Sequence, residues 1–407
     1  MAAEQNDPTK GRWLLAGAAV LVQLALGAVY AWSVFVNPLI SQMGWSRTQT
    51  ALPFIVTVGV LFIGTLVGGR IQDRIGPRPV VLAGGIIYSV GVMLASLVST
   101  PDQLWLLVLT YGVVAGLGLG VGYIVPIAML VKWFPDKRGL ITGIAVAGFG
   151  AGALITAPVA NRLMVADDVS QVFLPLGLAY LVATILGGAF FRNPSAGYRV
   201  PGFDGSRARV AGTVHSFKLG EALRTPQWYR LTAILALNVT AGIALISQAA
   251  PAAVEITGMS AASAASLVGV FAVFNGAGRV VWGWTSDFIG RMRVFLAIFA
   301  VQVLCFALLP GAMSVTLFVV LGSLVYLCYG GGFGTMPATA ADFFGPDNAG
   351  GIYGAMIVGW SIGGVVGPLV IAAIADATGG FTIPFYIIAA MVLGSSVLPL
   401  TTKKPAE

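Results

Sequence analysis

Residues 69–78 read Gly-Arg-Ile-Gln-Asp-Arg-Ile-Gly-Pro-Arg, and residues 283–293 read Gly-Trp-Thr-Ser-Asp-Phe-Ile-Gly-Arg-Met-Arg. Both segments contain the pattern Gly-x3-Asp-x2-Gly, at an offset of 214 residues. A second match has nearly the same offset, because Pro126 and Pro337 follow two glycine-rich runs and are 211 residues apart. Two independent matches indicate an internal repeat. The sequence therefore predicts two halves of common design.

Each half is apolar over most of its length. The 407 residues are 57% hydrophobic and 9% charged, whereas soluble proteins contain roughly 25% charged residues. Apolar runs of the length of a membrane helix, about 20 residues, occur at 13–39, 50–69, 80–99, 103–131, 139–161, 172–191, 229–250, 262–285, 292–311, 315–341, 351–375 and 381–400. Lipid requires internally satisfied backbone, and runs of this length favour helices over barrel strands.

We therefore predict an all-α membrane protein with twelve transmembrane helices in two pseudo-symmetric six-helix halves, 1–191 and 227–407. A polar, basic connector, 192–226, joins them. With the N-terminus in the cytoplasm, 19 of the 22 Lys and Arg residues fall on the cytoplasmic side. This bias predicts a multi-pass protein of the cell membrane with both termini cytoplasmic. It also accounts for the net charge of +7 without a nucleic-acid partner.

Residue types that build catalytic or metal sites are scarce. Cys305 and Cys328 lie in apolar runs, and the single histidine, His215, lies in the connector. No metalloprotease, nucleotide-binding lysine or nucleophile-elbow motif is present in the sequence. We therefore expect no disulfide, no metal, no cofactor and no enzyme activity.

The repeated Gly-x3-Asp-x2-Gly motif resembles that of the major facilitator superfamily, and the resemblance covers the whole chain. The segments Trp133–Gly139, Gly220–Trp228 and Asn275–Arg279 are similar to the monocarboxylate transporter family and the bacterial oxalate/formate antiporters. The overall likeness is greatest to prokaryotic homologues that carry lactate with a proton. The resemblance implies the major facilitator fold and a monomeric secondary transporter that carries a small monocarboxylate with a proton by alternating access. Exchange of one carboxylate for another is the first alternative, and a membrane solute receptor is the second.

Arg279 carries most of the functional argument. It lies eight residues before Asp287, which places it about 12 Å inside the membrane boundary. Burying an arginine there costs from about 2.5 to more than 10 kcal/mol, and its planar fork matches a carboxylate. We interpret Arg279 as the receptor for the substrate anion; an arginine that snorkels to the cytoplasmic face is the alternative. The oxalate-carrying relatives have a second cation where this chain has Trp360, so the resemblance implies one carboxylate with an apolar tail.

Other residues are candidates by their depth or by the resemblance. The predicted substrate-binding residues are Arg279, Asn275, Tyr30, Tyr123, Asn238, Tyr329, Phe333 and Trp360. The asparagines offer amides for a hydroxyl or keto oxygen, with helix–helix hydrogen bonding as the alternative for Asn275. Ordinary packing is the alternative for each aromatic residue. Eukaryotic relatives carry a proton-coupling Asp at the position of Asn275, so a proton here would travel with the substrate or through a tyrosine or water.

The repeated motif itself is a candidate gate. We expect Asp73 and Asp287 to accept hydrogen bonds from a helix N-terminus, which favours anions, and to pair with a nearby arginine. The predicted gating residues are Asp73, Arg74, Arg78, Asp287 and Arg291. Breaking these contacts would let the two halves rock. The alternative is a solvated turn whose charges only set the topology.

Overall fold

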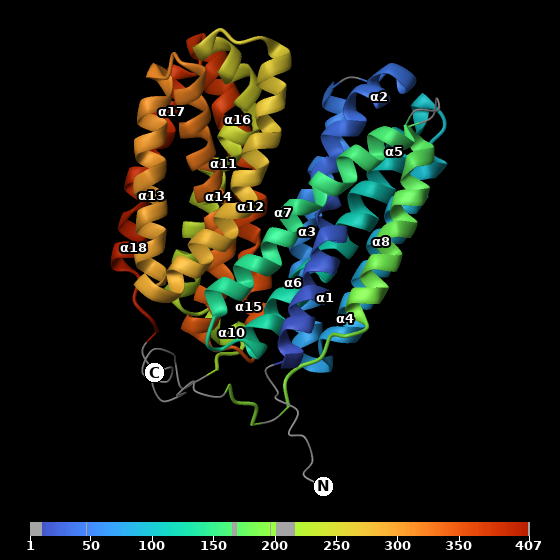
Figure 1. The fold of residues 1–407 in the computed structure, drawn as a ribbon, viewed down its shortest axis with the longest axis vertical. Coiled ribbons are helices and arrows are strands. Elements are labelled where there is room, and N and C mark those ends of the chain that lie inside the picture. Colours follow the sequence, from blue (N-terminus) through green and yellow to red (C-terminus); the bar gives the residue numbers. More distant parts are fainter. Residues whose placement is uncertain (1–9, 46, 165–168, 196, 201–215, 406–407) are drawn as a thin grey trace. The chain divides into compact units, whose positions relative to one another are not determined.

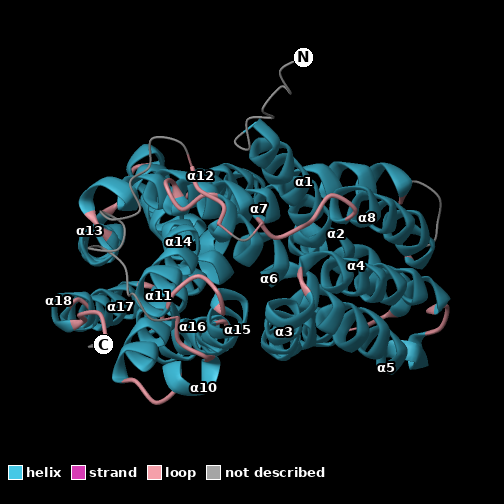
Figure 2. Ribbon diagram, turned by 90° about the horizontal axis from the view of Figure 1, so that it is seen from below, coloured by secondary structure: helices cyan, strands magenta, loops and turns pink. Residues whose placement is uncertain are grey.

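The computed structural model describes residues 10–45, 47–164, 169–195, 197–200 and 216–405. In these ranges it consists of helices and loops, without a strand (Figure 2). His215, Arg207 and Arg209 of the connector, which entered the sequence argument, lie outside the described residues. The described part therefore confirms the all-α prediction.

The chain divides into two compact units. Unit 1 is Met1–Arg138, Gly148–Ser216 and Gly345–Ala355, and unit 2 is Gly139–Ala147, Phe217–Phe344 and Met356–Glu407. Each unit thus contains a short segment from the opposite half of the sequence. The two units therefore differ from the predicted halves, which have single boundaries at 191 and 227, because each unit also includes a segment of the other half.

The helices of unit 1 lie in the first half of the chain, except for α15 (Figure 1). They are α1 (Lys10–Leu26), α2 (Ser33–Met43), α3 (Arg47–Ile75), α4 (Pro77–Leu94), α5 (Leu104–Leu107), α6 (Gly116–Trp133), most of α7 (Arg138–Leu163), α8 (Phe173–Gly188) and nearly all of α15 (Ala349–Met356). Inside this unit α6 packs against both α3 and α4, and α4 also packs against α8.

Unit 2 holds the helices of the second half and the first residues of α7. Its helices are α10 (Leu219–Ala222), α11 (Pro226–Thr257), α12 (Ala261–Ile289), α13 (Arg291–Leu308), α14 (Val315–Phe344), α16 (Val358–Thr378), α17 (Thr382–Ser395) and α18 (Val397–Thr401). Within the unit α14 packs against α11, α12 and α13, and α11 packs against α16. Figure 1 shows these long helices running side by side.

Eleven helices in the described residues are long and apolar enough to cross a membrane. They occupy eleven of the twelve predicted runs. The remaining run, 262–285, is occupied by α12, a continuous helix of 29 residues. The first run is not one regular helix, because a 3₁₀ segment at Gly27–Trp32 separates α1 from α2.

Most of the repeated motif falls between predicted apolar runs, after 50–69 and at the end of 262–285, where loops would be expected, but the structure places it on helices. Helix α3 continues through Asp73 to Ile75, and α12 continues through Asp287 to Ile289. The chain leaves the helix only at Gly76 and Gly290, which adopt φ values of 90° and 92°. Glycine adopts positive φ without a steric penalty, so the second glycine of each motif ends the helix. Each aspartate is consequently held on a rigid last turn.

Two glycines of α14 allow a close contact with α12 in unit 2. A Cβ atom on Gly330 would overlap the backbone oxygen of Asn275, and a Cβ atom on Gly334 would overlap that of Arg279. Without these side chains, the backbones of α14 and α12 approach directly. Small residues at a helix interface have this effect in membrane proteins generally. The close contact lies at the level of Arg279 and presses that part of α12 against α14.

Candidate functional site

Arg279 lies on α12 and is only 1% exposed. Its Nη1 donates to the backbone oxygen of Val146 at 2.8 Å, and its Nε donates to Asn275 Oδ1 at 3.3 Å. Nη2 has no hydrogen-bond partner among the described residues. Within the same residues, no carboxylate forms an ion pair with Arg279. The guanidinium is therefore a buried cation with unused donors and no countercharge in the described structure.

Aromatic side chains of unit 2 adjoin this cation. The Arg279 Cζ lies 5.3 Å from the centre of the Phe333 ring, a separation at which a cation is attracted to the ring face. Phe333 in turn contacts Tyr329 and Trp360, with ring centres 5.3 Å apart in both pairs. All three aromatic residues are buried. The structure thus brings four of the predicted residues into one group.

Both asparagines form hydrogen bonds inside unit 2. Asn275 accepts from Arg279, as expected for residues four apart on one helix face. Asn238 is fully buried: its Nδ2 donates to the Tyr329 backbone oxygen at 3.2 Å, and its Oδ1 accepts from Gln302 Nε2 at 3.1 Å. Asn238 therefore links α11, α13 and α14. Gln302 was not predicted; a lone glutamine inside an apolar run was the available signal.

Tyr30 and Tyr123 lie in unit 1. Both pack edge-on against Phe149, with ring centres 5.2 and 5.0 Å away. Gln23 Nε2 donates to the backbone oxygen of Tyr123 at 3.3 Å. These two predicted residues therefore share Phe149 as an aromatic neighbour inside unit 1.

Asp287 binds the N-terminus of α7 within unit 2. Its Oδ1 accepts from the Gly139 N–H at 2.8 Å, and its Oδ2 accepts from the Leu140 N–H at 2.9 Å. Arg291 donates to Asp287 Oδ1 at 2.7 Å and to Asp342 Oδ2 at 2.8 Å, and it also contacts Ser286. The carboxylate therefore receives two backbone donors of a helix N-terminus and one cation.

Asp73 makes a corresponding contact within unit 1, but its cation is more distant. Its Oδ2 accepts from the Gly351 N–H in the first turn of α15 at 2.8 Å. Its Oδ1 lies 3.9 Å from Lys132 Nζ. The expected pairing with Arg74 or Arg78 is not found: both are exposed, and neither makes an ion pair with a described residue. Lys132 supplies the nearby charge instead.

A third repeat explains why the two aspartates find equivalent donors. Pro135-Asp136-x2-Gly139 and Pro346-Asp347-x2-Gly350 are also 211 residues apart. The Leu140 and Gly351 N–H groups, which the two carboxylates bind, have the same offset. This repeat was the signal in the sequence that could have located the two helices whose N–H groups donate to the aspartates. The two halves can also be aligned on Asp73 and Asp287, which are 214 residues apart. In that alignment Arg279 corresponds to the neutral Thr65, whose hydroxyl donates to the Gly354 oxygen at 2.8 Å.

Comparison with known proteins gives consistent results. The model of the Major Facilitator Superfamily matches residues 15–252 and 232–407. The chain is 30% identical to an uncharacterized MFS-type transporter, YhjX, of Escherichia coli, covering 87% of this chain and 86% of the relative. It is 29% identical to the oxalate:formate antiporter of Oxalobacter formigenes, covering 84% and 81%, and 25% identical to monocarboxylate transporter 13 of Rattus norvegicus, covering 97% and 90%. The crystal structure of the E. coli fucose:proton symporter FucP has the same fold, with a TM-score of 0.74 at 16% identity, covering 98% of this chain and 100% of FucP.

Proposed function

Because the chain belongs to the major facilitator superfamily and is therefore a multi-pass secondary transporter and not an enzyme, we propose that it carries a small monocarboxylate together with a proton. Lactate, pyruvate and short fatty acids are the substrates of this class. The observation that supports the proposal best is the buried Arg279, whose Nη2 has no partner in the described structure. A carboxylate would supply both the countercharge and the missing acceptor.

The number of cations limits the substrate to one carboxylate. The second half carries Arg279, whereas the equivalent position of the first half is the neutral Thr65. The aromatic neighbours of Arg279, among them Phe333 and Trp360, offer apolar contact and no second charge. Two relatives also have names that state carboxylates as their cargo, an oxalate:formate antiporter and a monocarboxylate transporter. A single carboxylate with a short apolar tail matches these features.

The asparagines have different proposed roles. Asn275 accepts from Arg279 Nε and so fixes the direction of the guanidinium. Asn238 uses both ends of its amide inside the protein. We therefore assign Asn238 to holding α14 in place, and no longer to contact with substrate. Tyr30, Tyr123 and Tyr329 remain proposed as aromatic walls of the transport pathway.

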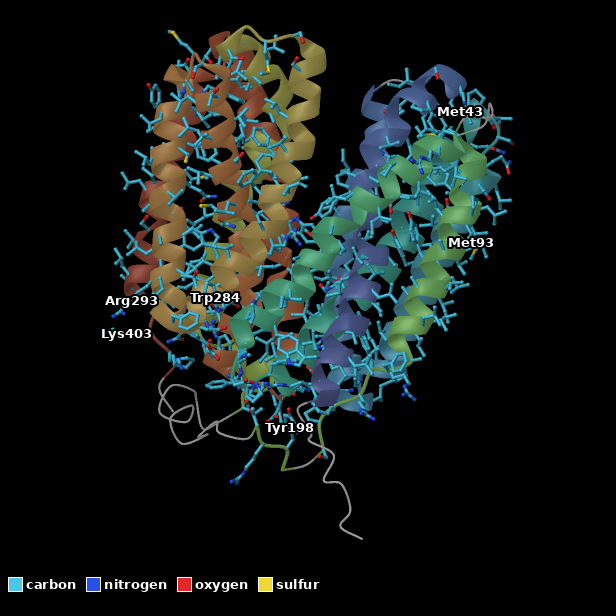
Figure 3. All side chains as sticks on the ribbon, viewed as in Figure 1. Met43, Met93, Tyr198, Trp284, Arg293 and Lys403 are labelled. Carbon is cyan, nitrogen blue, oxygen red and sulfur yellow. The ribbon has the colours of Figure 1, made fainter. Side chains whose placement is uncertain are left out.

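We also propose that the two aspartate contacts gate transport. Each carboxylate binds the first turn of a helix that the chain division assigns to its own unit. Both of these segments are covalently continuous with the other unit, α7 at Ala147 and α15 at Ala355. Because each bound segment continues into the other unit, we propose that a conformational cycle loosens these contacts when the units move. The basic residues on the connector side, such as Arg293 and Lys403 at one end of unit 2 (Figure 3), support a cell-membrane orientation with cytoplasmic termini.

Proton coupling is tested in vesicles that contain the purified protein and no internal carboxylate. We expect an inward pH gradient to drive uphill lactate uptake, with accumulation that disappears when an ionophore collapses the gradient. A strict requirement for internal formate or lactate would instead assign exchange. Binding of lactate without any uptake would assign a receptor and contradict transport.

The single-cation argument predicts the effect of Trp360→Lys. A second cation on α16, in the aromatic group beside Arg279, should lower lactate uptake at least about tenfold and create measurable oxalate binding, because each carboxylate then has its own partner. Trp360→Phe is the matched control and should retain lactate uptake. Failure of the lysine variant to bind oxalate in a thermal-shift titration would contradict the argument.

A further inference from the structure

A cavity of about 400 Å³ lies in unit 1, and its lining includes no residue of the Arg279 group. Its wall combines the end of α6, the loop before α7, the first residues of the connector and the loop before α15. The lining residues are Val131, Lys132, Pro135, Arg138, Asn193, Pro194, Ser195, Gly197, Tyr198, Pro346 and Asp347. The volume is in the range of small-molecule sites, about 300–1,000 Å³. Both prolines of the Pro-Asp-x2-Gly repeat belong to the wall, so the cavity joins the two repeated loops.

The first residues of the connector form one wall of this cavity, and hydrogen bonds to Trp133 hold them in place. Trp133 Nε1 donates to the Arg192 backbone oxygen at 2.7 Å, and the Tyr198 hydroxyl donates to the Trp133 backbone oxygen at 3.2 Å. The Trp133 and Tyr198 rings pack edge-on with centres 4.9 Å apart. Tyr198 is labelled in Figure 3, on the connector. The segment is thus fastened at both of its ends, which keeps the cavity open between them.

Two cations, Lys132 and Arg138, and one acid, Asp347, line the wall. Lys132 Nζ donates to the Asp347 backbone oxygen at 3.1 Å and lies 3.9 Å from Asp73. An ammonium group has three donors, so Lys132 retains donor capacity. Arg138 adds a planar fork suited to phosphate oxygens. The Asp347 side chain is exposed, and Lys132 contacts that residue through its backbone.

We propose that this cavity binds a phosphate monoester. The two cations hold the phosphate group, because a lysine point charge with an arginine fork suits its three oxygens. The remaining volume takes a small organic part beside the Tyr198 ring, with the Asn193 amide available to hydroxyl groups. Lys132 also belongs to the Asp73 contact. Occupation of the cavity therefore changes the charge beside the proposed gate.

Glycerol 3-phosphate is the probe, and the full-length protein in neutral detergent is the sample. A ligand that binds the folded state raises the thermal midpoint. We expect a saturable rise for the wild type and for Lys137→Gln, which removes an exposed neighbouring cation that does not line the cavity. Lys132→Gln and Arg138→Gln should each weaken the apparent affinity at least tenfold. Glycerol, and sodium chloride at equal ionic strength, should give no saturable rise.

Asn193→Asp keeps both cations and alters only an exposed residue of the wall, so it should fold normally. It therefore tests the site even if the Lys132 and Arg138 variants misfold. We expect it to lose the response by charge repulsion. An unchanged response in Asn193→Asp, Lys132→Gln and Arg138→Gln, or no response in the wild type, would overturn the proposal. Arg279→Gln should respond like the wild type, which separates this site from the proposed substrate site.

A lipid headgroup can present the same chemistry, and lipid discs distinguish the two sources. If discs that contain phosphatidic acid abolish the response to glycerol 3-phosphate, whereas phosphatidylcholine discs preserve it, the headgroup occupies the cavity. If the response persists in both kinds of disc, the ligand is a free phosphate monoester. Either result supports the site, provided that the response depends on Lys132.

Discussion

We expect Arg279→Gln to abolish the uptake of small monocarboxylates that we propose for this protein. Glutamine removes the positive charge and the planar fork that would hold a carboxylate. A hydrogen bond to a charged group contributes about 1.5–3 kcal/mol, and each 1.4 kcal/mol is a tenfold change in affinity. With two such bonds lost, we expect uptake of labelled lactate into vesicles to fall at least about 100-fold. The variant should still fold, because removing a buried charge is not intrinsically destabilising.

The control for this variant is Arg293→Gln, which removes an exposed arginine of α13 in the same unit. It changes the net charge equally and should leave uptake within about twofold of the wild type, because exposed charges contribute little. Arg279→Lys keeps the charge without the fork and should retain weak binding. Uptake by a folded Arg279→Gln protein within threefold of the wild type would move the carboxylate site elsewhere.

The burial of Arg279 could be inferred from the sequence because it depends on one helix. Its depth followed from its spacing to Asp287, and the structure leaves it 1% exposed. The helical fold and its repeat followed in the same way, from run lengths and from two offsets. These properties depend on local or periodic features of the sequence, so one sequence is enough to predict them.

The partners of these residues could not be inferred, because they depend on how helices rotate and pack. Lys132 is 59 positions from Asp73, and nothing in its local sequence marks it as the nearest cation. Asn238 was expected to face substrate, yet its amide is satisfied by Tyr329 and Gln302 on two other helices. Likewise, the apolar runs before the two motifs end at 69 and 285, whereas α3 and α12 continue until the second glycine of each motif.

Asp287→Asn should slow transport far more than it weakens substrate binding. The neutral amide retains one acceptor oxygen, so it cannot bind both the Gly139 and Leu140 N–H groups, and it loses the charge that pairs with Arg291. Because this network does not touch Arg279, we expect the Kd for lactate to stay within about threefold. Losing one or two charge-assisted bonds of about 1.5–3 kcal/mol destabilises the conformation that contains them. Turnover in vesicles should therefore fall at least about tenfold.

Asp73→Asn provides the graded comparison. Asp73 accepts from the Gly351 N–H and lies 3.9 Å from its cation, Lys132, whereas Asp287 accepts from two backbone donors and lies 2.7 Å from Arg291. We therefore expect a smaller fall in turnover for Asp73→Asn, about threefold to tenfold. Asp102→Asn, at an exposed position, should match the wild type. If both motif variants kept wild-type turnover, or if their Kd values rose in parallel with the loss of rate, the aspartates would serve topology or binding and would not act as the gate.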